Sequence, residues 1–391
     1  MVINFALRHK SNRVDFVTDR YRNISIKHAE RQRRAESGVQ NVTIFGPDQK
    51  VPKQWKKFMS VGSNKEELVK FLLEEWKSYA INEIEIFITH GDSTYCFRNS
   101  ICTELSELRS DHEEADTRLL LHCKHASVSY AHVILASPDT DVFVSALYHS
   151  WFISATLHFE TGCGNKQRIL NVNKIAKEIG YDWCDAMIGF HSFTGCDAVS
   201  AFQGKGKLSA LKTAEKKKEY CTAFRGIGMS LDVSDDVVNG IQKFVCHLYG
   251  ASKEDVVNKA RYYLFKMGKS TEEMLPPNYD SLILHIKRAN YDAYIRKNAL
   301  KGILNVPSPD GYGWSLNGDQ VNLVWTTIPP APDSLLEFVH CSCKLGCVTN
   351  RCSCKQNGIT CTDLCDAVKL VKTPRLTKDS MMMMMMMMMM K

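Results

Sequence analysis

The stretch HVILASPDTDVFVSAL, residues 132–147, runs from apolar residues through two aspartates into a second apolar run. The first run predicts a buried strand, SPD predicts a turn, and Asp139 or Asp141 is expected to cap a helix that begins near Val142. One cap needs only one aspartate. The second carboxylate is repelled by the first, which would raise a pKa unless a cation lies between them. The stretch therefore predicts a strand, a turn and a helix beside a candidate metal site.

Strand and helix patterns alternate on both sides of this stretch. Strands are expected at VDFVTD, EIEIFITHGD, HVILASPD and ISATLHFET, and helices at NKEELVKFLLEEWKSYA, ADTRLLLHCKHA and NVNKIAKEIG. This alternation predicts an α/β domain over residues 1–220, with a mostly parallel sheet covered on both faces. Sheets of that kind bind ligands at the carboxyl ends of their strands.

The remaining sequence changes character in steps. A helical extension is expected at residues 221–305, a β-hairpin with an NGD turn and a Pro-rich linker at 306–337, a Cys-rich segment at 338–367, and a disordered tail with ten consecutive Met at 368–391.

Length, composition and charge limit the class of protein. A chain of 391 residues with 44% hydrophobic residues can form two or three domains with a sizeable core. No run of 18 apolar residues occurs, and MVINFALRHKSNR lacks the features of a signal peptide, so we expect an intracellular protein without a membrane partner. The net charge of +7 suits a polyanionic partner.

Acidic residues stand near several predicted strand ends and helix starts. Carboxylates gathered in this way can hold two hard cations about 4 Å apart, which activate water and stabilise a leaving oxygen. Taken singly, each residue is more simply a solvated cap or turn. The residues concerned are Asp19, Glu113, Glu114, Asp116, Asp139, Asp141 and Asp197.

The order of these motifs resembles the flap endonuclease branch of the PIN-like nucleases, over about residues 14–215. The motifs are VTDRY with Asp19, SIKHAERQRR with Lys27 and Arg33, then EAD, SPDTD, and GCD followed by GKGKLSA. The resemblance implies a PIN-like three-layer fold and a structure-specific nuclease acting on DNA, with RNA as the alternative substrate. It also implies that Lys27 and Arg33 steady the scissile phosphate, and that Mg²⁺ or Mn²⁺ is held by Glu114, Asp116, Asp139, Asp141 and Asp197.

Two departures from the family pattern affect this interpretation. Asp116 stands where the family has Glu, and Glu113, three residues earlier on the same helical face, could substitute for it. The family begins with a strand that bears its own aspartate, and only 18 residues precede Asp19, so the chain is expected to start inside the domain. The whole arrangement is also similar to animal proteins that look transposon-derived.

The GKGK sequence after GCD is a candidate nucleic-acid contact. Small residues let backbone amides approach a phosphate, and the lysines add positive charge there. The alternative is an ordinary turn between two helices. The residues are Gly204, Lys205, Gly206 and Lys207.

The sequence CSCKLGCVTNRCSCKQNGITCTDLC, residues 341–365, is the strongest local signal in the chain. Without a secretory signal, this density of cysteines predicts bound Zn²⁺ rather than disulfides. Nearby basic residues favour ionisation of the thiols. The expected ligands are Cys341, Cys343, Cys347, Cys352, Cys354, Cys361 and Cys365.

This spacing resembles the tesmin-type CXC repeat, which implies shared zinc ions and DNA contacts through Lys344, Arg351 and Lys355. The family pattern ends in C-x-C, whereas D-A follows Cys365 here. Because seven cysteines cannot complete two separate tetrahedral sites, we expect shared thiolates or help from His340.

Two hypotheses for function follow from the sequence. The first is a transposon-derived, metal-dependent nuclease with a zinc-bound DNA-binding tail, located in the nucleus. The second is a catalytically inactive DNA-binding or scaffold protein that keeps the same fold. A Rossmann-type nucleotide-binding enzyme is disfavoured because no strand-linked G-x-G-x-x-G occurs.

Overall fold

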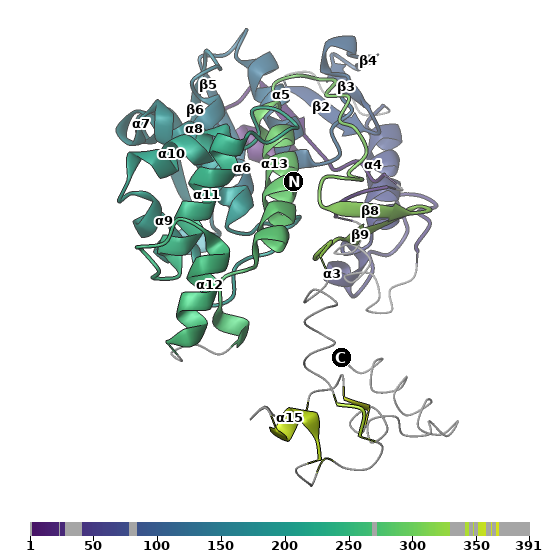
Figure 1. Ribbon diagram of the computed structural model, residues 1–391. Coiled ribbons are helices and arrows are strands. Elements are labelled where there is room, and N and C mark those ends of the chain that lie inside the picture. The colour runs from purple at the N-terminus through teal and green to yellow at the C-terminus, as the bar shows by residue number, and fades with distance from the viewer. Residues whose placement is uncertain are drawn as a thin grey trace, which may run out of the picture. The chain divides into compact units, whose positions relative to one another are not determined.

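The chain folds into two compact units, which we call the core unit (Met1–Trp325) and the tail unit (Thr326–Lys391). The computed structural model describes residues 2–22, 24–27, 41–77, 84–267, 272–328, 341–343, 347, 351–356, 361 and 365–366 (Figure 1). The expected tail at 368–391 lies outside these residues, as do Arg33, His340 and Lys344.

The strands of the core unit form small separate sheets. One sheet contains, in order, β1 (Arg13–Phe16), β2 (Glu85–His90), β3 (Ser93–Arg98) and β4 (Ile101–Glu104). A second contains β5 (His132–Ala136), β6 (Thr156–Thr161) and β7 (Arg168–Asn171). The hairpin consists of β8 (Trp314–Asn317) and β9 (Gln320–Leu323), and confirms the predicted NGD turn.

The prediction of a mostly parallel sheet is wrong for the described strands. Only β1 with β2 and β5 with β6 are parallel there, whereas the β2–β3, β3–β4, β6–β7 and β8–β9 pairs are antiparallel. The reason is the length of the connections. Two residues, Gly91 and Asp92, join β2 to β3, and Asn99 and Ser100, both with positive φ, join β3 to β4. Such turns reverse the chain and leave no room for a crossover helix.

Helices contribute more residues to the core unit than strands do. They are α1 (Val2–Arg8), α3 (Trp55–Phe58), α4 (Gly62–Lys77), α5 (Ala115–Ala126), α6 (Thr140–His149), α7 (Val172–Ile179), α8 (Tyr181–Phe193), α9 (Lys207–Ala214), α10 (Lys218–Gly226), α11 (Asp235–Leu248), α12 (Val257–Lys266) and α13 (Tyr279–Lys297). The helices expected before residue 220 are confirmed as α4, α5 and α7, and the expected helical region after it as α11, α12 and α13.

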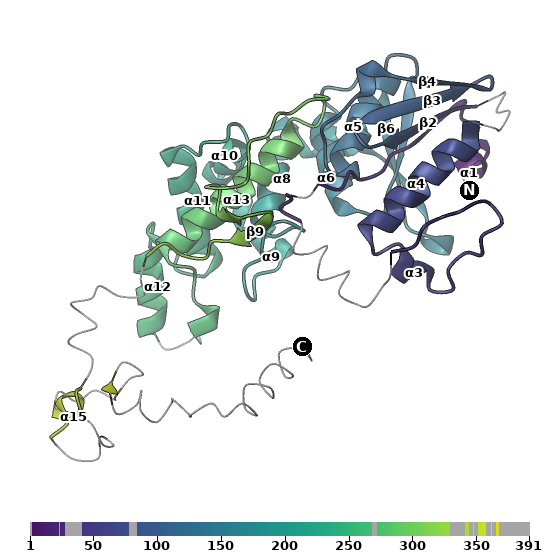
Figure 2. The same ribbon diagram turned by 90° about the vertical axis from the view of Figure 1, so that its right-hand side faces the viewer.

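The largest hydrophobic core joins side chains from α6 and from α8 to α13, between Val144 and Ala293. Figure 2 shows these helices on one side of the core unit, with α4 and strands β2 to β4 on the other. The boundary expected at residue 220 therefore lies inside one compact unit, because the helices on either side of it share a single core.

Close helix packing within this core depends on Gly189 in α8. A Cβ at this position would lie 2.2 Å from the backbone oxygen of Phe224 in α10. The glycine therefore lets the two backbones approach more closely than any side chain would permit.

Within the part of the chain that the structure describes, no helix combines the length and the apolar character needed to cross a membrane.

Candidate functional site

The junction of β5 and α6 explains why two aspartates stand together. Asp139 is the N-cap of α6, and its Oδ1 accepts a hydrogen bond of 2.9 Å from the backbone N–H of Asp141. This confirms the predicted cap. Asp139 is exposed, whereas the Asp141 side chain is only 13% exposed. The second aspartate thus has a different environment, and a different partner, from the first.

Arg296 of α13 is the cation beside Asp141. Its Nη2 lies 2.7 Å from Oδ2 of Asp141, and Nε2 of His191 in α8 lies 2.8 Å from Oδ1. Burial alone would raise the pKa of Asp141, but the hydrogen bond from His191 and the charge of Arg296 hold it well below its usual value. The cation that contacts Asp141 is therefore a guanidinium from a distant helix.

This ion pair belongs to a longer chain of contacts. Nε of Arg296 lies 2.9 Å from Oδ2 of Asp292, which also accepts a hydrogen bond of 2.6 Å from Ser192. On the other side, Nζ of Lys207 donates to Nδ1 of His191 at 2.9 Å. Because a lysine only donates, Nδ1 is the acceptor and Nε2 carries the hydrogen that faces Asp141. Ion pairs and hydrogen bonds thus connect α13, α6, α8 and the start of α9.

Lys27 brings two further acidic segments together. Its Nζ lies 2.9 Å from Oε2 of Glu114, at the start of α5, and 3.6 Å from Oδ2 of Asp197, after α8. The residue is 8% exposed. Burial opposes its charge, but the charge of Glu114 and the hydrogen bond to it hold the pKa of Lys27 above its usual value.

Asp116 lies among these charges with a strongly altered acidity. Burial, together with the charges of Glu114 and Asp139, raises the pKa of Asp116 to about 7, and the charges of Lys27 and Arg296 offset this rise only in part. A carboxyl group that titrates near neutral pH among other carboxylates is typical of functional sites, although structural ion-pair networks also produce it.

Asp19 has a structural role at the edge of this cluster. Its Oδ1 accepts a hydrogen bond of 2.9 Å from the backbone N–H of Ala115, and its Oδ2 accepts one of 3.3 Å from the hydroxyl of Tyr21. Asp19 therefore caps α5 from outside the helix. Glu113, the expected substitute for Asp116, accepts a hydrogen bond from Ser25 instead.

A cleft of about 600 Å³ opens beside the cluster. Acidic residues of the α5 start, including Glu114 and Asp116, line it together with Lys27 and Arg296. Arg20 and Arg22 add further positive charge to its wall. The cleft is large enough for part of a nucleotide and has both carboxylates and cations to contact it.

The spacing of the carboxylates is a stringent test of whether they fit a metal. Among the described residues, the only sets of three or more histidine, cysteine or carboxylate donors within 4.8 Å of one another are formed by cysteines. The acidic side chains share one region and have the oxygen donors that Mg²⁺ prefers. With Lys27 and Arg296 between them, however, they are not arranged around a common point.

The Gly204–Lys207 loop is placed by contacts on both sides. Gly204 has a φ of +67°, and Nζ of Lys205 lies 4.7 Å from the centre of the Tyr249 ring. Gly206 precedes α9, and Lys207 turns inward to His191. The loop therefore touches the acidic cluster through one lysine and the helical layer through the other.

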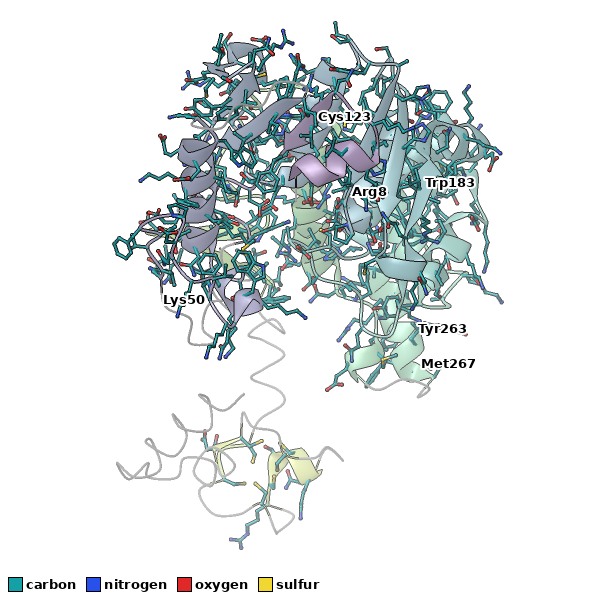
Figure 3. The ribbon with its side chains drawn as sticks, turned by 180° about the vertical axis from the view of Figure 1, so that it is seen from behind. Arg8, Lys50, Cys123, Trp183, Tyr263 and Met267 are labelled. Atoms are coloured by element: carbon teal, nitrogen blue, oxygen red, sulfur yellow. The ribbon has the colours of Figure 1, made fainter. Side chains whose placement is uncertain are left out.

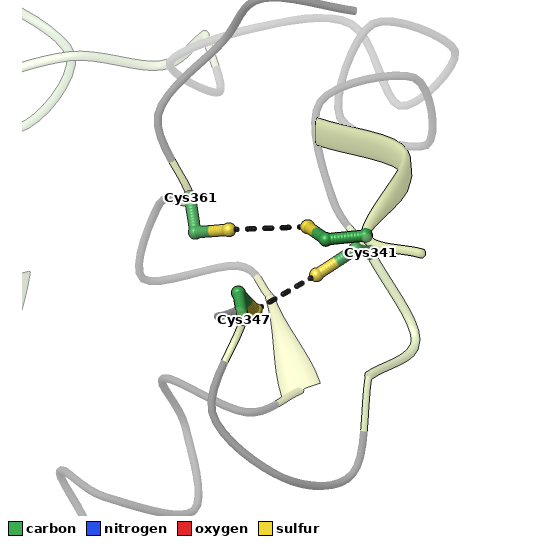
Figure 4. Close-up of side chains that lie close together, drawn as sticks. Cys341, Cys347 and Cys361 are labelled. Carbon is green, nitrogen blue, oxygen red and sulfur yellow. Dashed lines mark hydrogen bonds between the residues drawn. The ribbon is translucent and has the colours of Figure 1, made fainter. Parts of the chain in front are cut away.

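In the tail unit, the cysteines gather into two overlapping groups. Cys341 and Cys361 belong to both, and Cys343 belongs to neither. Figure 4 shows Cys341, Cys347 and Cys361 facing one another. The two groups are Cys341, Cys347, Cys352 and Cys361, and Cys341, Cys354, Cys361 and Cys365.

These groups fit a soft metal ion such as zinc. The Sγ atoms of Cys341 and Cys347 are 3.4 Å apart, those of Cys352 and Cys361 3.5 Å, and those of Cys354 and Cys365 3.7 Å. Four sulfurs around zinc, with bonds of about 2.3 Å, are separated by about 3.8 Å. All 15 cysteines are free thiols. The clustered cysteines can thus hold a metal ion, as predicted.

Local backbone geometry helps one of these thiols to ionise. The backbone N–H of Lys355 is the main cause that lowers the pKa of Cys352 to about 6. Cys352 directly precedes the short helix α15 (Ser353–Gln356). Arg351 and Lys355 are exposed, as a contact to nucleic acid would require.

The sequence prediction did not include His191, Asp292 or Arg296. Asp292 and Arg296 are four residues apart in α13, a spacing that pairs opposite charges on one helical face, so this pair was recognisable. The contact between Arg296 and Asp141 was not recognisable, because it depends on the tertiary fold. No family model, curated protein or solved structure matches the chain.

Proposed function

We propose that the core unit is a metal-dependent nuclease that hydrolyses phosphodiester bonds in DNA, with RNA as the alternative substrate. The observation that carries this proposal is the gathering of carboxylates from separate chain segments beside one cleft. The resemblance of the motif order to flap endonucleases supports the same class. The proposed metal ligands are Glu114, Asp116, Asp139, Asp141 and Asp197.

Each part of the cluster has a role in this proposal. The carboxylates would hold Mg²⁺ or Mn²⁺, which supplies an activated water and stabilises the leaving oxygen. His191 and Arg296 orient Asp141 from both sides. Lys27 balances Glu114 and Asp197, and its ammonium group would donate to an incoming phosphate.

The alternative function is a catalytically inactive DNA-binding or scaffold protein. A specific observation favours it, because Lys27 and Arg296 already neutralise the carboxylates. Internal cations can stabilise such a cluster without any metal ion. In that case the cleft would bind nucleic acid but would not cleave it.

Cleavage and manganese binding by the full chain separate the two functions. The active protein should cleave labelled branched DNA in Mg²⁺ and bind Mn²⁺ in calorimetry. Asp139→Asn and Asp141→Asn should each abolish cleavage, whereas Asp319→Asn, an exposed position in the β8–β9 turn, should not. The inactive protein would instead be supported if the chain binds DNA but does not cleave it, and if Mn²⁺ binding does not depend on Asp141.

We also propose that the tail unit binds Zn²⁺ and adds affinity for DNA, and that the protein acts in the nucleus. The overlapping thiol groups and the exposed Arg351 and Lys355 support this role. Deletion of residues 338–391 should weaken DNA binding and reduce its salt dependence, because contacts to phosphate are lost. Unchanged binding by the shortened chain would contradict the proposal.

A further inference from the structure

Helix α12 presents an unusual amount of aromatic surface. Val257 and Ala260 are fully buried, and Leu264 packs against the same core, so one face of the helix is anchored. Tyr262 is 68% exposed and Phe265 67% exposed, although both are large aromatic residues. They are three positions apart and therefore neighbours on the outer face.

Within α12 itself, the charged side chains beside the exposed rings are positive. Tyr263, the next residue along the helix, is 46% exposed, and Figure 3 shows it with Met267 on this helix. Lys259 and Lys266 are exposed on α12, whose sequence VNKARYYLFK contains no acidic residue. An isolated exposed apolar side chain is ordinary, but a contiguous set indicates a binding surface. The positive charge of these lysines favours an anionic partner.

The Gly204–Lys207 loop contacts the helical layer to which α12 belongs. Nζ of Lys205 lies over the ring of Tyr249, and Tyr249 shares a hydrophobic core with Val257 and Ala260 of α12. On the other side of the loop, Lys207 contacts His191.

We propose that the outer face of α12, formed by Tyr262 and Phe265, is a stacking surface for the bases of single-stranded nucleic acid. Every base has a flat face that stacks on an aromatic ring, and the exposed lysines of the helix contact the phosphates. The inference rests on the proposed function for its choice of ligand. It adds a single-stranded segment held on α12.

Binding without cleavage tests this inference. Fluorescence anisotropy of a labelled 15-nucleotide poly-dT with the full chain in EDTA removes any dependence on magnesium. Tyr262→Ala and Phe265→Ala should each weaken binding by at least about fivefold. Tyr262→Phe, which keeps the ring, should bind like the unchanged chain. The matched control is Phe45→Ala, because Phe45 is a solvent-facing phenylalanine that is 89% exposed.

A second ligand separates stacking from charge. An abasic oligonucleotide of the same length keeps the phosphates but lacks the bases, so the two alanine variants should bind it as the unchanged chain does. Lys266→Ala should lower the salt slope by about 0.7, as expected for one lost phosphate contact, whereas Tyr262→Ala should leave the slope unchanged. All of the variants replace exposed side chains, and thermal unfolding verifies that they fold.

Three results would overturn the inference. The first is equal poly-dT binding by the alanine variants and the Phe45→Ala control. The second is an equal loss of binding to the abasic ligand. The third is a dimer in sedimentation that Phe265→Ala converts to a monomer without changing poly-dT binding, which would make this face an interface between copies. If the chain fails to cleave DNA but its binding to poly-dT still depends on the aromatic rings, only the proposed nuclease function would be rejected.

Discussion

Arg296 stabilises two buried carboxylates at once, so its removal affects more than one contact. We expect Arg296→Met to lower the free energy of unfolding by about 3 to 5 kcal/mol, because Asp141 and Asp292 keep their charges but lose their partner. Urea unfolding measures this loss. Arg109→Met is the control, since this arginine is 62% exposed beside Asp92 and should change the midpoint little. Similar effects of the two substitutions would contradict a special role for Arg296.

Asp116 should make stability depend on pH in an unusual direction. Its folded pKa of about 7 exceeds the ordinary value of 3.8, so the folded chain binds more protons than the unfolded chain between these values. The residue's contribution to stability therefore decreases as pH rises through that window. Asp116→Asn should raise the melting temperature at pH 8 and have little effect at pH 4. A larger stabilisation at pH 4 than at pH 8 would show that the pKa of this carboxyl group is not raised.

At this scale the sequence predicted the acidic positions better than their partners. The Asp139 cap followed from the local turn. The cation expected between the two aspartates was a metal ion, whereas the cation that contacts Asp141 is Arg296. The cation itself is 155 residues away in sequence, and no local pattern contains that information.

Among the elements, α8 and α10 show how closely backbones approach around one glycine. Gly189→Ala should destabilise the core unit by at least about 1 to 3 kcal/mol, because its Cβ would meet the backbone oxygen of Phe224 and the helices would have to separate. Gly46→Ala is the control, since a Cβ there would meet nothing within 4 Å. Chemical denaturation compares the two. Equal midpoints would indicate that the helices can move apart without cost.

The sequence predicted some elements well and others not at all. Strand β5 and helix α6 were recognisable because an apolar run, a turn and a cap follow one another. Helix α8 was not, because its sequence YDWCDAMIGFHSF is buried on most sides and lacks an amphipathic period or a side-chain cap. The parallel sheet was wrong because the short turns after β2 and β3 were not weighed against the helix alternation.

At the scale of the whole molecule, the two units depend on different forces. The core unit has large apolar clusters, whereas the buried cluster of the tail unit consists of cysteines. Removing zinc from the loaded chain with a chelator should therefore expose at least six tail thiols to titration and leave the main thermal transition unchanged. A large shift of that transition, or no gain of reactive thiols, would contradict this division.

The ion pair between Asp141 and Arg296 also sets the order of events during synthesis. A ribosome that has made the chain only to the end of α12 has released both aspartates of the β5–α6 junction, but not their guanidinium. The nascent chain then also lacks Leu282, Ile286, Ala289 and Ala293, which complete the largest core. Because domains generally fold as units, Asp141 gains its guanidinium and becomes enclosed only when α13 emerges. Until then its carboxylate lies open in an unfinished protein.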